Sequence, residues 1–179
     1  MATLDNLSEA FYKSLVYFLW KAAALNSDFA DRMYWTYPGF NLADVALPFI
    51  LVRDYHVADS FASQPDVAGY ESRDIVFSFS IMVYCQDHDH QQYLPQLVKR
   101  TVETATVGNE YGIQVYKGFD SSGDPDAGSE LDVAEPFLGD IVPMGAEEEE
   151  DVLHKFASSI DGEWSVFRDK TKKFISTNS

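Results

Sequence analysis

Asp87, His88, Asp89 and His90 are consecutive, and they form the one cluster in this sequence whose side chains have metal-ligand chemistry. Carboxylates and imidazoles together suit zinc, nickel or manganese. In an extended segment His88 and His90 would share a face, but at most one outside ligand could join them, because no second H-x-H and no H-E-x-x-H motif occurs. The commoner role of such residues between a strand and a helix is capping, here by Asp89. We expect no bound metal, with His88 and His90 as weak candidates.

Nucleophilic and phosphate chemistry lack the motifs that they require. No G-x-S-x-G elbow, G-x-G-x-x-G or G-x-x-x-x-G-K-[ST] motif is present, and Cys85 lies in an apolar run, where we expect it to be buried. The acidic loop 118–128 contains Asp120, Asp124 and Asp126, which would repel phosphate and which lack the EF-hand spacing for calcium. We expect no catalytic residue, no cofactor and no enzyme. The alternative is a metal-binding module or metal-dependent enzyme that uses residues 87–90.

The chain has 179 residues, of which 46% are hydrophobic, so a single domain can bury a core without metals or disulfides. Its lone cysteine favours a reducing, intracellular origin. No run approaches the ~18 apolar residues of a membrane span, and the first residues lack the pattern of a signal peptide. We therefore expect a soluble protein that does not contact a membrane.

The net charge of -16, from 29 acidic and 13 basic residues, would repel phosphate backbones and anionic membranes. Nucleic-acid binding is therefore not expected. Such acidity gives solubility or salt adaptation, or it keeps a surface near DNA from adhering to it. A second alternative is an acidic DNA mimic or inhibitor, in which the negative charge is the active surface.

Residues 74–85 predict the central strand of the fold. Ile75, Phe77, Phe79, Ile81 and Val83 alternate with a less apolar set, and the run is longer than an ordinary strand of about 5–6 residues. Helical periodicity on both sides predicts helices over 6–25 and 93–106 that cover its better face. The predicted fold class is α/β (α+β), a single domain with a mainly antiparallel sheet.

Within these helices several residues carry further expectations. Asn6 with Glu9 resembles a capping box, and Pro95 is tolerable only in the first turn of its helix. Tyr12 and Trp20 widen the apolar stripe of the first helix. This helix either contacts a second subunit or lies between the sheet and the C-terminal segment.

The remaining segments are predicted as follows. Strands are expected over 33–37, 47–57 and 111–116, and some strand content over 131–144. Residues 58–72 and 118–128 read as loops, the first longer than hairpin closure requires. The acids 147–151 suit the first turn of a helix that continues to Ile160, and 163–175 fits either a closing strand or a short helix.

The order of these elements resembles one family. A helix, a short strand, the strand LPFILVRD, a long loop, the strand RDIVFSFSIMVYCQD and the helix QQYLPQLVKRTVETA follow one another over residues 7–107. This layout resembles the tail terminator and tail-completion (head-tail joining) proteins of long-tailed bacteriophages. The chain after Gly118 departs from the compact size of that family.

The resemblance implies a mechanical function. A hexameric ring would cap the tail tube, stop its growth and present a docking face to the head connector or stopper protein. The implied location is the virion neck, after synthesis in the host cytoplasm, with DNA passing through the channel without specific binding. The acids 147–151 would face solvent or the channel. The candidate interface residues are Phe61, Tyr70, Tyr12, Trp20, Lys170, Lys172 and Lys173.

Overall fold

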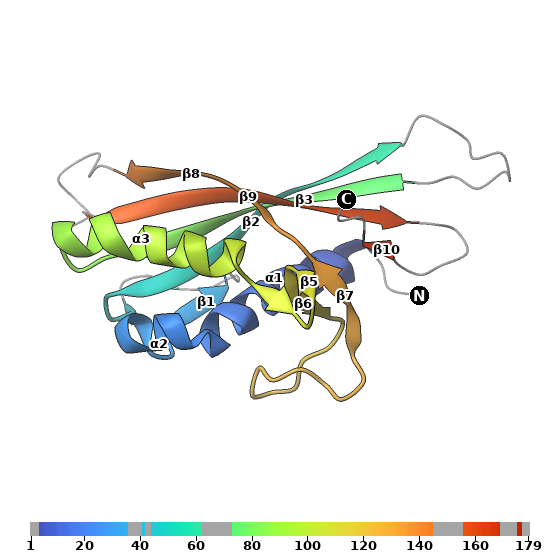
Figure 1. Cartoon of the computed structure of the whole chain (residues 1–179), viewed down its shortest axis with the longest axis horizontal. Coiled ribbons are helices and arrows are strands. Elements are labelled where there is room, and N and C mark those ends of the chain that lie inside the picture. The colour runs from blue at the N-terminus through green and yellow to red at the C-terminus, as the bar shows by residue number, and fades with distance from the viewer. Residues whose placement is uncertain are drawn as a thin grey trace, which may run out of the picture.

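A computed structural model of the chain describes residues 4–35, 41, 44–61, 73–144, 156–168 and 175–176 (Figure 1). Its helices are α1 (Leu4–Lys21), α2 (Ala23–Phe29) and α3 (His88–Glu103). Its strands are β1 (Met33–Trp35), β2 (Phe49–Phe61), β3 (Arg73–Tyr84), β4 (Thr106–Val107), β5 (Glu110–Tyr111), β6 (Ile113–Tyr116), β7 (Glu130–Ala134), β8 (Phe137–Met144), β9 (Ala157–Arg168) and β10 (Ile175–Ser176).

The main sheet has six strands in the order β1-β2-β3-β9-β10, and β8 pairs with β9 beside β10. Only β1 runs parallel to its neighbour, β2, and the other pairs are antiparallel. β3 is paired along its whole length on both sides, from Arg73 to Tyr84. The predicted α+β class and the central position of this strand are therefore confirmed.

One face of the sheet holds the main core. The alternate β3 residues Phe77, Phe79, Ile81 and Val83 are buried with apolar residues of α1 and α3, and the helices lie on this one side of the sheet in Figure 1. Trp164 of β9 packs its ring 4.7 Å from that of Phe11 in α1. The predicted covering of the better face by helices is confirmed.

The opposite face buries a smaller cluster. Phe49, Leu51, Met82, Tyr84 and Ala157 form it, and the rings of Phe49 and Tyr84 stack with centroids 4.4 Å apart. The second half of β3 is thus buried on both faces, which explains why its sequence is apolar on both sets of alternate residues.

The first predicted helix, 6–25, is two helices in the structure. Ala22 has an extended backbone (φ -68, ψ 108) that separates α1 from α2, and this change of direction lets Leu25 and Phe29 enter the core. Asn6 lies inside α1, which begins at Leu4, so the predicted capping box is wrong.

The second predicted helix, 93–106, corresponds to α3, which begins and ends earlier in the sequence than predicted. Asp87 has extended backbone and caps α3, so the helix starts at His88, and the expected cap Asp89 lies in its first turn. Pro95 lies in the helix interior, so its predicted restriction to the first turn is wrong. It lacks the N–H that would reach the carbonyl of Gln91, and its buried ring packs in place of that hydrogen bond.

The C-terminal half is richer in strands than predicted. Gly112 (φ 124) divides the expected strand 111–116 into β5 and β6, and a Cβ there would lie 2.5 Å from the carbonyl oxygen of Ala134. β7 and β8 confirm strand content in 131–144. The helix predicted to continue to Ile160 is wrong from Ala157 onward, because β9 begins there and pairs with all of β3. The strand alternative for 163–175 is correct as far as Arg168.

The predicted loop 58–72 is shorter at its start, because β2 continues to Phe61 in register with Arg73. Residues 62–72 and the acids 147–151 lie outside the described residues.

Candidate functional site

The Asp87–His90 cluster is built as a helix cap. The backbone N–H of His90 donates to Asp87 Oδ1 at 2.8 Å, and His90 Nδ1 lies 3.3 Å from Asp87 Oδ2. His88 Nε2 lies 3.1 Å from Gln92 Nε2, one turn along α3. Within the described part of the chain, no three His, Cys, Asp or Glu side chains converge as a metal site would require. The capping role is confirmed, with Asp87 in place of Asp89.

Cys85 follows β3 directly and is buried, as predicted, with 2% of its surface exposed. Burial, and secondly the negative charge of Asp87, raise the pKa of its thiol to about 12. The sulfur is therefore protonated at neutral pH, and a thiol in that form is a weak nucleophile. The chemistry of a catalytic cysteine is not available at this position.

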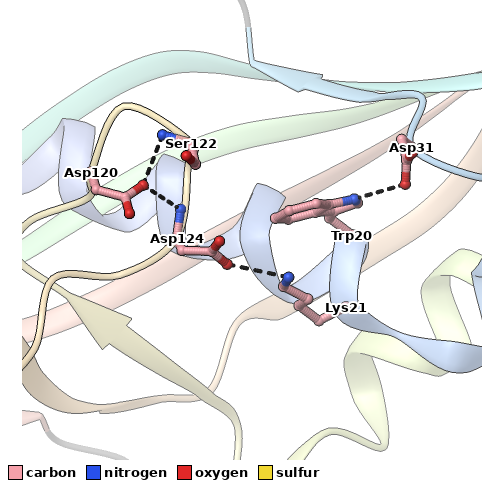
Figure 2. A network of polar contacts seen from close by, with 6 residues as sticks. All are labelled: Trp20, Lys21, Asp31, Asp120, Ser122 and Asp124. Atoms are coloured by element: carbon pink, nitrogen blue, oxygen red, sulfur yellow. Dashed lines mark hydrogen bonds and ion pairs between the residues drawn. The ribbon is translucent and has the colours of Figure 1, made fainter.

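Lys21, at the end of α1, contacts both the loop 118–128 and Trp20 (Figure 2). Its Nζ lies 3.2 Å from Asp124 Oδ1 and 3.7 Å from the ring centroid of Trp20. The indole Nε1 of Trp20 donates to Asp31 Oδ1 at 3.0 Å. Trp20, a candidate for subunit contact, is therefore already engaged with Lys21 and Asp31 of its own chain.

The acidic loop 118–128 is fixed to α1 by these contacts and by its own turns. Asp120 Oδ1 accepts from the backbone N–H groups of Ser122 and Asp124, at 2.8 and 3.1 Å (Figure 2). The ring of Phe119 packs 6.1 Å from Tyr17 and 6.0 Å from Tyr116. One loop carboxylate closes a turn and another pairs with a lysine, so these contacts attach the loop to α1.

The other interface candidates are distributed differently. Tyr12 is 1% exposed, and its hydroxyl donates to the carbonyl oxygen of Ser78 at 3.1 Å, so it belongs to the core and its predicted role in a subunit contact is wrong. Phe61 is the last residue of β2. Tyr70, Lys170, Lys172 and Lys173 lie outside the described residues.

Among the described side chains, three of the five large hydrophobic residues that are exposed lie on β8, and sequence reasoning missed them. Phe137, Val142 and Met144 are 76%, 54% and 43% exposed, and we call them the apolar stripe. These three residues pair with residues 163, 159 and 157 of β9, and they lie on the side of the sheet opposite the main core. A β-bulge between Leu138 and Ile141 shifts the alternation, so Phe137 and Val142 share a face although five positions separate them.

β8 is an edge strand, and its sequence limits strand addition. Pro143 lacks a backbone donor, and the bulge interrupts the edge. The carbonyl oxygen of Gly139 within the bulge accepts from Lys99 Nζ at 2.7 Å. The stripe is therefore suited to contact through side chains and not to backbone pairing.

The chain matches no protein-family model, and it matches no curated protein. Among the described residues no helix is long and apolar enough to cross a membrane.

Proposed function

We propose that this protein is a structural virion protein of a long-tailed bacteriophage, which forms a ring, hexameric by analogy, that caps the tail tube and joins it to the head connector. The observation that supports this most is the succession α1, β1, β2, β3 and α3, with β2 and β3 forming one long antiparallel pair. This is the order of elements on which the resemblance to tail terminator and tail-completion proteins rests.

The surface supports an assembly function more than a chemical one. In the described part of the chain, Asp87 caps α3, Cys85 is buried in the core, and the pair of Lys21 with Asp124 holds the loop 118–128. The apolar stripe, in contrast, lies exposed on an edge strand. Exposed apolar surface on a strongly charged protein is typical of a site that another protein covers.

The charge of -16 fits a channel component. A ring of such subunits would repel the DNA backbone, so that DNA passes without adhering. The ring would need no cofactor, because capping a tube requires only shape and contact.

Negative-stain imaging of the purified protein at about 0.15 M salt tests the ring directly. We expect closed rings about 10 nm across, given the size of a domain of this length, and native mass spectrometry should give their copy number. A protein that remains monomeric up to the highest soluble concentration would contradict the ring.

Tail capping needs a separate test. Purified tail-tube protein polymerises in the presence or absence of this protein, and tube length is measured by electron microscopy. We expect tubes that stop growing and carry a ring at one end, with the partner at the opposite ring face being the connector. Rings that leave tube length unchanged would contradict the tail assignment but not the assembly.

A further inference from the structure

We propose that the apolar stripe is the docking site for an amphipathic helix of a partner protein, a helix whose apolar face is bordered by lysines or arginines. Such a helix would belong to a protein that the proposed ring joins, so this assignment rests on the proposed function. Four features of the described residues support it: the exposure of the stripe, the charges around it, its length and the interrupted edge of β8.

The stripe lies on the side of the sheet opposite α1 and α3, which pack against the main core (Figure 1). On the same strand, Leu138 and Ile141 pack in that core, so β8 is apolar on both faces. One of these faces is buried, and the other carries the exposed stripe. A strand that is apolar on an exposed face is typical of a sheet that a second layer covers.

Carboxylates border the stripe on the same side of the sheet. Glu163 of β9 is the register partner of Phe137, and Asp161 lies two positions before it on the same face. Both acids are exposed, and so is Asp140 of the bulge. A partner that covers the stripe therefore brings its flanking side chains next to three carboxylates, which favours lysine or arginine at those positions.

Lys99 of α3 approaches β8 from the helix side of the sheet. Its Nζ donates to the carbonyl oxygen of Gly139 at 2.7 Å and lies 3.7 Å from Glu103 Oε1. Its side chain is 24% exposed. This lysine already has two acceptors, and one positive charge does not balance the three exposed carboxylates around the stripe.

Two arginines lie farther from the stripe. Arg168 of β9 lies five positions beyond the partner of Phe137, about 17 Å along the strand. Arg53 lies on β2, and β3 separates that strand from β9. Its guanidinium donates to the hydroxyl of Tyr84 at 3.2 Å. Among the described side chains, the charge next to the stripe is therefore negative.

The expected occupant is a helix rather than a strand. Pro143 lacks a backbone donor and the bulge interrupts the edge of β8, so backbone pairing is limited. The residues of β9 that pair with the stripe run from Ala157 to Glu163, so the stripe is about 20 Å long. A helix of about 14 residues covers this length. Helices are also the common cover of an apolar sheet face.

A second copy of this chain fits the stripe less well than another protein does. The apolar faces of α1 and α3 already pack in their own core. Two copies also repel each other, because each carries a charge of -16. A basic partner is attracted instead, and its cations can form charge-assisted hydrogen bonds with Asp161 and Glu163. Contacts between copies in a ring would use other surfaces.

Fluorescence anisotropy with labelled synthetic peptides tests the site at about 0.15 M salt. The probe is a peptide of about 18 residues with leucines at helical spacing, bordered by lysines. One comparison peptide has the same residues in scrambled order, and another has glutamate in place of lysine. We expect the amphipathic lysine peptide to bind at least about tenfold more tightly than either comparison.

Matched variants separate the stripe from general effects of charge and exposure. Val142→Ser or Phe137→Ser should weaken binding of the lysine peptide about tenfold, and Glu163→Gln about threefold. Tyr111→Ser removes another exposed aromatic ring and Glu110→Gln another exposed carboxylate, both on β5. Neither control should change the affinity. Circular dichroism checks that every variant is folded.

Methionine methyl NMR locates the bound peptide without altering the stripe. Met144 belongs to the stripe, whereas Met33 is buried in the main core. In protein labelled at its methionine methyl groups, the lysine peptide should shift the signal of Met144 and leave that of Met33 in place. The variant Met144→Leu assigns the signal.

The site is wrong if the scrambled peptide binds as tightly as the amphipathic one, or if the stripe variants bind as tightly as the wild type. Loss of self-association in Val142→Ser with unchanged peptide binding would assign the stripe to a second copy instead. If the peptide binds as expected but rings leave tail tubes unchanged, the docking site stands and the proposed function fails. If rings cap tubes and no peptide binds the stripe, the proposed function stands and this site fails.

Discussion

Gly162 of β9 lies directly under the ring of Phe79 in β3, its register partner. A Cβ at this position would collide with the Phe79 ring and lie 2.8 Å from Leu138 Cδ2. In the sequence, Gly162 is interpreted as a residue that ends a helix. The packing of a distant aromatic ring against a glycine produces no local sequence pattern, so this role could not be predicted. Its role depends on a residue far away in the chain.

We predict that Gly162→Ala lowers the free energy of unfolding by about 1–3 kcal/mol, the usual cost of overpacking a core. Gly139→Ala is the milder comparison and should cost less, because its Cβ would lie 3.3 Å from the carbonyl oxygen of Asp161, a tight contact without overlap. Urea denaturation measures both. In a Phe79→Leu background the cost of Gly162→Ala should shrink, and an unchanged cost would show that the ring is not its cause.

Because Cys85 is buried, we predict that the free energy of unfolding falls at alkaline pH. Its pKa is raised by burial from 9.0 to about 12 in the folded state, so above pH 9 the unfolded chain loses the thiol proton and the folded chain keeps it. The stabilisation is complete below the unfolded pKa and is lost as pH rises toward the folded pKa. By linkage the loss is about 2 kcal/mol at pH about 10.5.

The measurement compares wild type with Cys85→Ala in urea at pH about 8 and about 10.5. Other groups titrate in both proteins. The comparison is therefore between the two changes in the free energy of unfolding from the lower to the higher pH. We expect the wild type to lose more stability than the variant, and native Cys85 to resist thiol reagents until the protein unfolds. Equal changes in the free energy of unfolding for the two proteins would mean that the thiol ionises in the folded state.

At the scale of elements, the attachment of the loop 118–128 to α1 depends on Lys21. Lys21→Met keeps the aliphatic stem but removes both the ion pair with Asp124 and the cation–π contact with Trp20, and we expect a loss of about 1 kcal/mol. Hydrogen exchange should show faster exchange at the amides of Ser122 and Asp124.

The ion pair Glu9–Lys13 provides the control for this element. Its carboxylate is 46% exposed, against 47% for Asp124, but it joins residues within one helix. Glu9→Gln should cost about 0.3–0.5 kcal/mol and leave the loop amides unchanged. If Glu9→Gln and Asp124→Asn have the same effect on exchange in the loop, Lys21 is not its anchor.

Elements whose neighbours bury a whole face could be predicted from the sequence. β3 and α3 show clear periods because Phe77, Phe79 and Val98 all enter one core. β9 could not be assigned, because its serines and Gly162 carry little pattern and its strand form comes from pairing with β3. The apolar stripe was hidden for a related reason: the bulge between Leu138 and Ile141 changes which residues share a face.

At the scale of the whole molecule, the net charge should control assembly. Six copies at -16 each would carry -96. At 0.01 M salt the Debye length is about 30 Å, so repulsion acts across whole subunits, whereas at 0.15 M it falls to about 8 Å. Apolar contacts between subunits act at shorter range than this screening length, so they survive the added salt that weakens the repulsion.

We therefore predict that self-association is weak at about 0.01 M salt and strengthens toward about 0.15 M, at fixed protein concentration. Sedimentation velocity across a salt series measures it, and Arg100→Glu, which makes the net charge more negative at an exposed position of α3, should move the curve to higher salt. A ring that tightens as salt is removed would show that local charge pairs outweigh the net charge. In that case the acidity of the chain would not limit closure, because subunits that attract at low salt are held by their contact charges alone.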